Sequence, residues 1–169
     1  MFELFLPYFI ANALGIEPGE TNTAPEVVAE ASVESAAPAA AREPEDQTPT
    51  GKFTTAGEVK PILGMTKANW VAVRNYEGQD LLYFTHLMSW RCGIWDVKYS
   101  INGADPTKIF EMEPCYDDTA TPNNMLMPDG QLPFLAFEEN SIESIVVELT
   151  YDDGTSELAE FARSAIQIP

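Results

Sequence analysis

Apolar side chains recur at every second position through much of this chain from Trp70 onward, and this period limits its possible folds more than any other feature. Residues in a β-strand point alternately to the two faces of a sheet, so a period of two is typical of strands with one buried face. The clearest case is the segment of residues 94–101, where one side is formed by Trp95, Val97, Tyr99 and Ile101. The same pattern predicts strands at residues 70–76, 81–90, 94–101, 107–113, 132–137, 143–151 and 155–163.

Turn residues separate these segments. Asn102-Gly103 and Asp152-Asp153-Gly154 combine residues that tolerate positive φ, and both are typical of tight hairpins between antiparallel strands. Short strands joined in this way favour a mainly β chain, and we expect an antiparallel β-sandwich of the immunoglobulin or fibronectin type over residues 52–169. Pro61 is suited to the first turn of a short helix over residues 62–68. Residues 155–163 fit a helical face as well as a strand.

Residues 16–51 differ in composition from the rest of the chain. They are rich in Ala, Pro and Glu, contain no aromatic residue, and carry a single basic side chain, Arg42. Such a segment buries too little apolar surface to offset the chain entropy lost on folding, so we expect a disordered acidic linker here. A short helix over residues 25–37 is the alternative, with Pro38 and Pro44 to end it.

Residues 1–15 are a possible leader. Leu4 to Ile10 form a compact apolar run, and Ala11-Asn12-Ala13 fits the small-x-small pattern of a signal-peptidase site. The run has no preceding Lys or Arg, and it is too short for a membrane-spanning helix, which needs about 20 apolar residues. Export to the periplasm or secretion is therefore our expectation. A cytoplasmic protein with an apolar end that docks on a partner or on its own domain is the alternative.

The chain has two cysteines, Cys92 and Cys115. Their separation suits a disulfide, which would stabilise the fold by roughly 3 kcal/mol in the chain-entropy model. We expect the bond to form in an oxidising compartment and both thiols to stay reduced in a cytosol.

Charge excludes some functions. The chain carries 27 Asp and Glu against 9 Lys and Arg, which gives a formal net charge of -18. Nucleic acids and anionic membrane surfaces are bound by clustered cations, so neither is an expected partner. No GxSxG elbow and no glycine-rich phosphate loop occurs, and a single histidine leaves little for acid–base catalysis. We expect a protein that is not an enzyme and that holds no cofactor.

Two weaker patterns suggest ligands. His86 and Met88 would point to one side of a strand, as would Met125 and Met127, and imidazole with thioethers suits Cu(I). Core packing of the same side chains is the competing interpretation. Trp70, Trp90 and Trp95 could provide a platform for a sugar ring if any of them were exposed, although all three also read as core residues.

The sequence as a whole favours a non-enzymatic binding or assembly module of a bacterial-type cell envelope. Its partner would be another protein. The long loop of residues 116–131 would form the contact, because loops of such length are often functional. Met125, Leu126 and Met127 are the candidate contact residues in that loop. A small Cu(I)-handling protein using His86, Met88, Met125 and Met127 is one alternative, and a carbohydrate-binding module is another.

Overall fold

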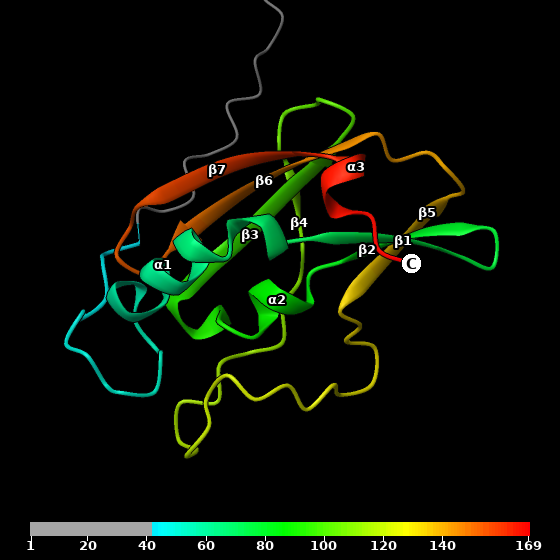
Figure 1. Cartoon of the computed structure of the whole chain (residues 1–169). Coiled ribbons are helices and arrows are strands. Elements are labelled where there is room, and N and C mark those ends of the chain that lie inside the picture. The colour runs from blue at the N-terminus through cyan, green and yellow to red at the C-terminus, as the bar shows by residue number, and fades with distance from the viewer. Residues whose placement is uncertain (1–41) are drawn as a thin grey trace, which may run out of the picture. The chain divides into compact units, whose positions relative to one another are not determined.

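Two antiparallel sheets form the framework of residues 42–169, the part of the chain that the structure, a computed structural model, describes. The three-stranded sheet has the order β1-β2-β5, and the four-stranded sheet has the order β4-β3-β6-β7 (Figure 1). Their bounds are β1 (Ala72–Tyr76), β2 (Gln79–Tyr83), β3 (Ile94–Ile101), β4 (Lys108–Ile109), β5 (Phe134–Glu138), β6 (Ser144–Tyr151) and β7 (Ser156–Ala162). The expectation of a mainly β chain with antiparallel sheets is confirmed. The predicted leader, residues 1–15, and linker residues 16–41 lie outside the described residues.

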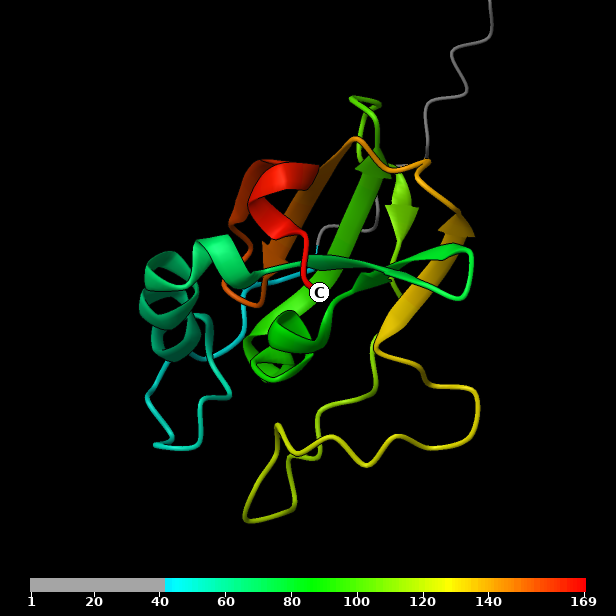
Figure 2. The same cartoon turned by 45° about the vertical axis from the view of Figure 1, so that its right-hand side comes forward.

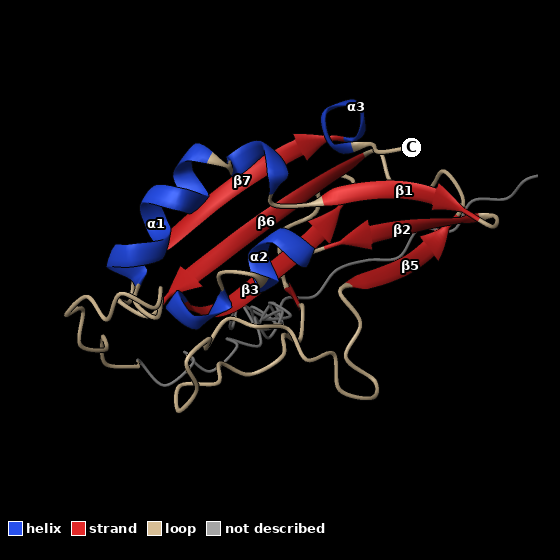
Figure 3. Ribbon diagram, turned by 60° about the horizontal axis from the view of Figure 1, so that its bottom comes forward, coloured by secondary structure: helices blue, strands red, loops and turns tan. Residues whose placement is uncertain are grey.

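Short helices accompany the strands. They are α1 (Ala56–Met65), η1 (Lys67–Asn69), α2 (Thr85–Met88), η2 (Arg91–Gly93) and α3 (Arg163–Ile166). Figure 3 shows α1 beside β6 and β7, where its Lys60 ammonium lies 4.9 Å from the centre of the Tyr151 ring. None of the helices within residues 42–169 is both long enough and apolar enough to span a membrane.

Hairpin chemistry explains how the four-stranded sheet is connected. Asn102 and Gly103 both have positive φ, 58° and 78°, and they turn the chain from β3 into β4 as the sequence predicts. The turn of residues 152–155 joins β6 to β7 in the same way, with Gly154 at a φ of 81°. Residues 155–163 are therefore a strand for most of their length, and the helical interpretation holds only from Arg163 onward.

The core lies on one face of the four-stranded sheet. Alternate residues of β3, β6 and β7 point into it, while the residues between them are mostly polar and more exposed. The buried members of this face are Val97, Tyr99, Ile145, Val147, Leu149, Tyr151, Ala159 and Phe161. Val59 and Leu63 of α1 and Leu82 of β2 complete the same core.

A buried ion pair joins the end of β7 to the other sheet. Asp80 of β2 is fully buried, and its carboxylate accepts hydrogen bonds from both terminal nitrogens of Arg163 and from the backbone N–H of Ile142. The Arg163 hydrogen bonds are the main reason that the pKa of Asp80 falls to about 2. The carboxylate is thus charged at neutral pH, as a buried acid must be to hold its guanidinium partner.

Residues 81–90, predicted as one strand, are a strand followed by a helix. β2 ends at Tyr83, and α2 occupies Thr85–Met88. Leu87 and Met88 are consecutive and both fully buried, which a strand with one buried face does not allow. A short apolar run fits a buried helix as well as a strand, so periodicity could not separate the two.

The helix near Pro61 also begins earlier than predicted. Thr55 and Glu58 form a capping box, in which the Thr55 hydroxyl accepts the Glu58 N–H and the Glu58 carboxylate accepts the Thr55 N–H. This cap starts α1 at Ala56, so Pro61 lies inside the helix and not at its first position. The S/T-x-x-E pattern at residues 55–58 was the available signal.

The folded unit also begins before residue 52. The Glu45 N–H donates to the Asp152 carbonyl at 2.8 Å, and the Glu45 carboxylate accepts the Trp95 indole N–H at 2.7 Å. Arg42 forms an ion pair with Asp96 at 3.0 Å. Residues 42–51, placed by the sequence in the linker, are therefore bound to the sheet, because polar side chains supply the contacts that their apolar content lacks.

Candidate functional site

The connection between β4 and β5 is long and has no regular secondary structure, yet many contacts hold it in place. It forms the yellow-green to yellow loop that extends from the sheets in Figures 1 and 2. The predicted disulfide is present: Cys92 of η2 is bonded to Cys115 of this connection, with their Cα atoms 5.0 Å apart. The disulfide fixes the loop at its start, and a pair of buried charged residues organises the rest of the loop.

Arg91 is the first of these charged residues. Its side chain is 2% exposed, and its guanidinium donates to backbone carbonyls on both sides of the loop. The acceptors within 3.0 Å are the carbonyls of Met88, Glu113, Pro114, Asn123 and Asn124. Burial lowers the pKa of Arg91, but a guanidinium keeps its charge at neutral pH. One fixed cation thus brings distant parts of the loop together.

Glu113 is the second. Its side chain is also 2% exposed, and its carboxylate accepts the Tyr116 hydroxyl at 2.6 Å and the Leu126 N–H at 2.7 Å. The Met127 N–H approaches the other oxygen at 3.4 Å. Burial by itself would raise the pKa of Glu113, but these hydrogen bonds and the Arg91 charge outweigh it and the pKa lies below its ordinary value. The ionised carboxylate therefore fixes the backbone at residues 126–127.

Two neighbouring apolar side chains of this loop, at positions 126 and 127, are exposed. Leu126 is 62% exposed and Met127 is 41% exposed, whereas Met125 is half-buried and packs against the core. Met127 has a φ of 51°, in the left-handed region that few side chains adopt. Of the three predicted contact residues, two are thus presented to solvent and one anchors the loop.

Asn123 ties the loop to the segment before α1. Its side-chain oxygen accepts the Cys92 N–H at 2.9 Å, and its amide donates to the Phe53 carbonyl at 2.8 Å. Phe53 is itself 42% exposed and packs edge-on against Trp90. Neither Arg91 nor Glu113 was singled out from the sequence. An arginine inside an apolar stretch next to a bridged cysteine was the only signal.

The residues proposed for copper do not share one face. His86 and Met88 lie in α2, where residues two apart point in different directions, so the strand argument that paired them is wrong. Met88 is fully buried in the core, while the His86 Nε2 atom lies 2.7 Å from the Thr66 hydroxyl. Met125 packs on the core and Met127 faces outward. Within residues 42–169, no three His, Cys, Asp or Glu side chains converge as metal ligands do.

The tryptophans are engaged with other side chains. Trp70 is fully buried and donates its indole N–H to the Leu63 carbonyl at 2.9 Å. Trp90 contacts Phe53, and the Arg42 guanidinium lies 5.4 Å from the centre of the Trp95 ring. The exposed indole face on which the sugar-binding hypothesis depended is therefore not supported by these contacts.

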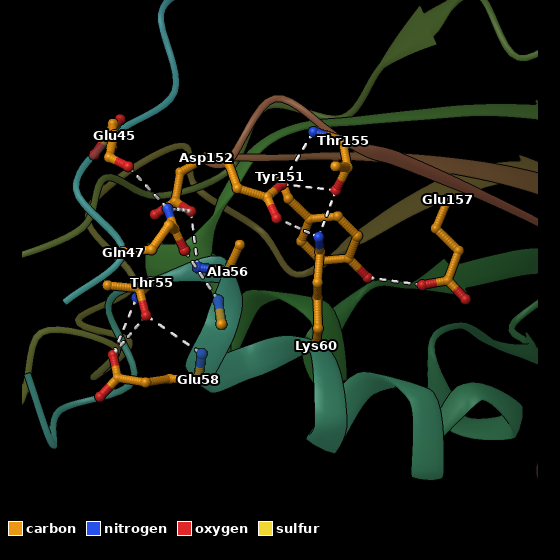
Figure 4. A network of polar contacts seen from close by, with 12 residues as sticks. Glu45, Gln47, Thr55, Ala56, Glu58, Lys60, Tyr151, Asp152, Thr155 and Glu157 are labelled. Atoms are coloured by element: carbon orange, nitrogen blue, oxygen red, sulfur yellow. Dashed lines mark hydrogen bonds and ion pairs between the residues drawn. The ribbon is translucent and has the colours of Figure 1, made fainter. Parts of the chain in front are cut away.

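A separate polar network surrounds the turn between β6 and β7 (Figure 4). Asp152 is 2% exposed, and its Oδ1 atom accepts the Ala56 N–H at 2.7 Å and the Gln47 amide at 2.9 Å. Its Oδ2 atom has no hydrogen-bond partner among the described residues. Burial, with the nearby charges of Glu45 and Asp153, raises the pKa of Asp152. The neighbouring Asp153 instead pairs with Lys60. This network holds residues 45–47 and the start of α1 to the sheet.

No protein-family model, no curated protein and no solved structure matches this chain.

Proposed function

We propose that this protein is a non-enzymatic binding or assembly module of a bacterial-type cell envelope, and that it contacts a protein partner through the loop of residues 116–131. One observation carries the proposal: the buried Glu113 carboxylate fixes the backbone at residues 126–127, from which the Leu126 and Met127 side chains extend into solvent.

Preorganisation of the loop favours binding. A partner that orders a flexible loop on binding loses affinity to the entropy of that ordering, so a loop already held in place binds more tightly for the same contact. Arg91, Glu113 and the disulfide do this holding in the free protein. Apolar side chains on a fixed backbone then gain the contact energy that buried interface residues provide.

The proposed immunoglobulin-like assignment is supported by strand order. In immunoglobulin domains the first, second and fifth strands share one sheet and the third, sixth and seventh the other, with the fourth strand at an edge. The orders β1-β2-β5 and β4-β3-β6-β7 follow this scheme for six strands, but β4 lies beside β3, whereas the fourth strand of a constant-type domain lies in the sheet of the first, second and fifth. Such sandwiches commonly serve as binding modules at cell surfaces.

The proposed location is the periplasm or the extracellular space. The disulfide between Cys92 and Cys115 supports this, since such bonds persist mainly in oxidising compartments. A cytoplasmic location remains the alternative, and the redox state of the protein isolated from its host distinguishes the two.

Site-specific photocrosslinking tests the contact. We expect a benzophenone amino acid at position 126, introduced in the native host, to give one discrete adduct. The same group at position 65 should give none, although Met65 is 82% exposed and thus the more accessible site. Excess unlabelled protein should suppress the adduct, and excess of the double variant L126S/M127S should not. Adducts of equal yield at both positions, or suppression by the double variant, would contradict the proposal.

A further inference from the structure

A pocket of about 470 Å³, with no residue of the loop in its lining, lies between the start of β1, α2 and the last residues of the chain. The apolar residues that line it include Val71, Ile166 and Ile168. The polar residues that line it are Asn69, Tyr83, Thr85, His86, Ser89 and Gln167. Its size falls within the range of small-molecule sites, roughly 300–1,000 Å³.

The pocket is uncharged although the protein is strongly acidic. The net charge of the chain is -18, yet no Asp, Glu, Lys or Arg contributes to the lining. His86 is the one titratable side chain there besides Tyr83, and burial lowers the pKa of His86, which keeps the ring neutral at neutral pH. A charged ligand would lose its hydration in this pocket without gaining a counter-charge, so the pocket favours an uncharged one.

The hydrogen bonds of Thr66 decide which nitrogen of His86 carries the proton. The Thr66 hydroxyl lies 2.7 Å from the Ile62 carbonyl oxygen and 2.7 Å from the His86 Nε2 atom. Each contact needs one hydrogen, the carbonyl has none, and the hydroxyl has one. The hydroxyl therefore donates to Ile62, and His86 Nε2–H donates to the hydroxyl. The other nitrogen, Nδ1, is left as an acceptor with no protein partner among residues 42–169.

We propose that this pocket binds a small uncharged molecule with an apolar body and a hydroxyl group, and that the hydroxyl donates a hydrogen bond to Nδ1 of His86. The apolar lining residues contact the body of the ligand, and Nδ1 accepts the hydrogen bond that orients it. This site is distinct from the loop proposed above to contact a protein, so the two proposals can fail independently.

Three related probes test the ligand class. Naphthol, naphthalene and naphthoate share one ring system and differ in carrying a hydroxyl, a hydrogen or a carboxylate. Each is titrated into the protein while the ¹⁵N signals of the His86 ring and the amide signals of Val71 and Ile168 are followed by NMR. We expect naphthol to bind more tightly than the other two and to shift the Nδ1 signal. We expect naphthalene to move the amide signals of the pocket but to leave Nδ1 nearly unchanged.

The variant His86→Gln separates the hydrogen bond from the shape of the pocket. A glutamine amide can still donate to the Thr66 hydroxyl, but it provides no acceptor where Nδ1 lies. Naphthol should bind this variant about five-fold more weakly, the usual effect of one neutral hydrogen bond. Naphthalene should bind as before, which shows that the pocket is intact. The proposal is overturned if naphthoate binds best, if no probe moves the pocket signals, or if the substitution weakens naphthol and naphthalene equally.

Discussion

At the scale of single residues, the adjacent acids Asp152 and Asp153 have opposite environments. Asp152 is buried, has one oxygen without a hydrogen-bond partner among residues 42–169 and lies near the charge of Glu45. Asp153 bonds to Lys60 and to the Thr155 hydroxyl, so its pKa is lowered even though burial acts to raise it. The sequence indicates a turn at both positions, correctly. It could not show the difference, because Gln47, Ala56 and Lys60, which bond to these acids, lie roughly 100 residues away in the chain.

This difference predicts opposite effects of two matched substitutions. The pKa of Asp152 is raised in the folded state. The stabilising contribution of this carboxyl group is therefore fully present below its ordinary pKa and is lost as pH rises through the folded-state pKa. Ionised Asp152 thus lowers the free energy of unfolding at neutral pH, and Asp152→Asn should raise it, since the asparagine oxygen keeps the Ala56 and Gln47 bonds. The gain should shrink as pH falls.

The matched substitution is Asp153→Asn. The pKa of Asp153 is lowered in the folded state. The stabilising contribution of this carboxylate is therefore present above its ordinary pKa and is lost as pH falls through the folded-state pKa. This variant should be less stable than the wild type at neutral pH and should approach it in acid. Denaturant unfolding between about pH 4 and about pH 8 measures both curves. Two variants that shift stability in the same direction would contradict the assignment.

At the scale of elements, Glu113 controls the loop between β4 and β5. Its carboxylate accepts from the Tyr116 hydroxyl and from two backbone N–H groups. A glutamine at this position offers one acceptor oxygen and adds a donor, so at least one buried donor loses its partner. Glu113→Gln should weaken the loop by roughly 1–3 kcal/mol, the cost of an unsatisfied buried group.

Hydrogen exchange measures this effect locally. The amides of Leu126 and Met127 should exchange faster in Glu113→Gln, while those of β6 should not change. Glu111→Gln is the control, because Glu111 is exposed and lies two residues earlier in the same segment. Equal acceleration in both variants would mean that Glu113 does not hold the loop.

Elements with local signals were predictable and the others were not. The turns at Asn102-Gly103 and at residues 152–155 depend on residues within the turn, and both are correct. Residues 107–113 were expected to form a full strand, but only Lys108–Ile109 pairs with β3. The α2 helix was missed because Phe84 leaves the strand to stack on Phe110, at 4.1 Å between ring centres, and that contact is not local. His86 and Met88, which lie in α2, were assigned to a strand for the same reason.

At the scale of the whole molecule, the disulfide joins the two segments that carry the candidate site. Cys92 follows Arg91 directly, and Cys115 is two residues from Glu113. Cys92→Ser/Cys115→Ser should lower the free energy of unfolding by roughly 3 kcal/mol, because the unfolded chain gains the freedom of an open loop. Denaturant unfolding tests this, with the reduced wild type as the matched control. A reduced wild type as stable as the oxidised protein would contradict the expectation.

The two-sheet architecture was predictable because strand periodicity and turn chemistry agree over most of residues 69–163. The start of the folded unit was not predictable from the sequence. Residues 42–51 resemble a linker in composition, and the residues that hold them, among them Asp96 of β3 and Asp152 of the turn after β6, come near them only in the folded chain.

The last residues of the chain also limit how the protein can associate with other molecules. Gln167 forms a parallel bridge with Val73, and the Ile168 N–H donates to the Val73 carbonyl at 2.9 Å. An open edge strand is a template on which another chain can add, which is a common route to aggregation. The covered stretch of β1 is closed to such addition, and on the other sheet the edge strand β7 carries the charges of Glu157 and Glu160. Removal of residues 167–169 would therefore uncover this stretch of β1, and the truncated protein should associate strand to strand at high protein concentration.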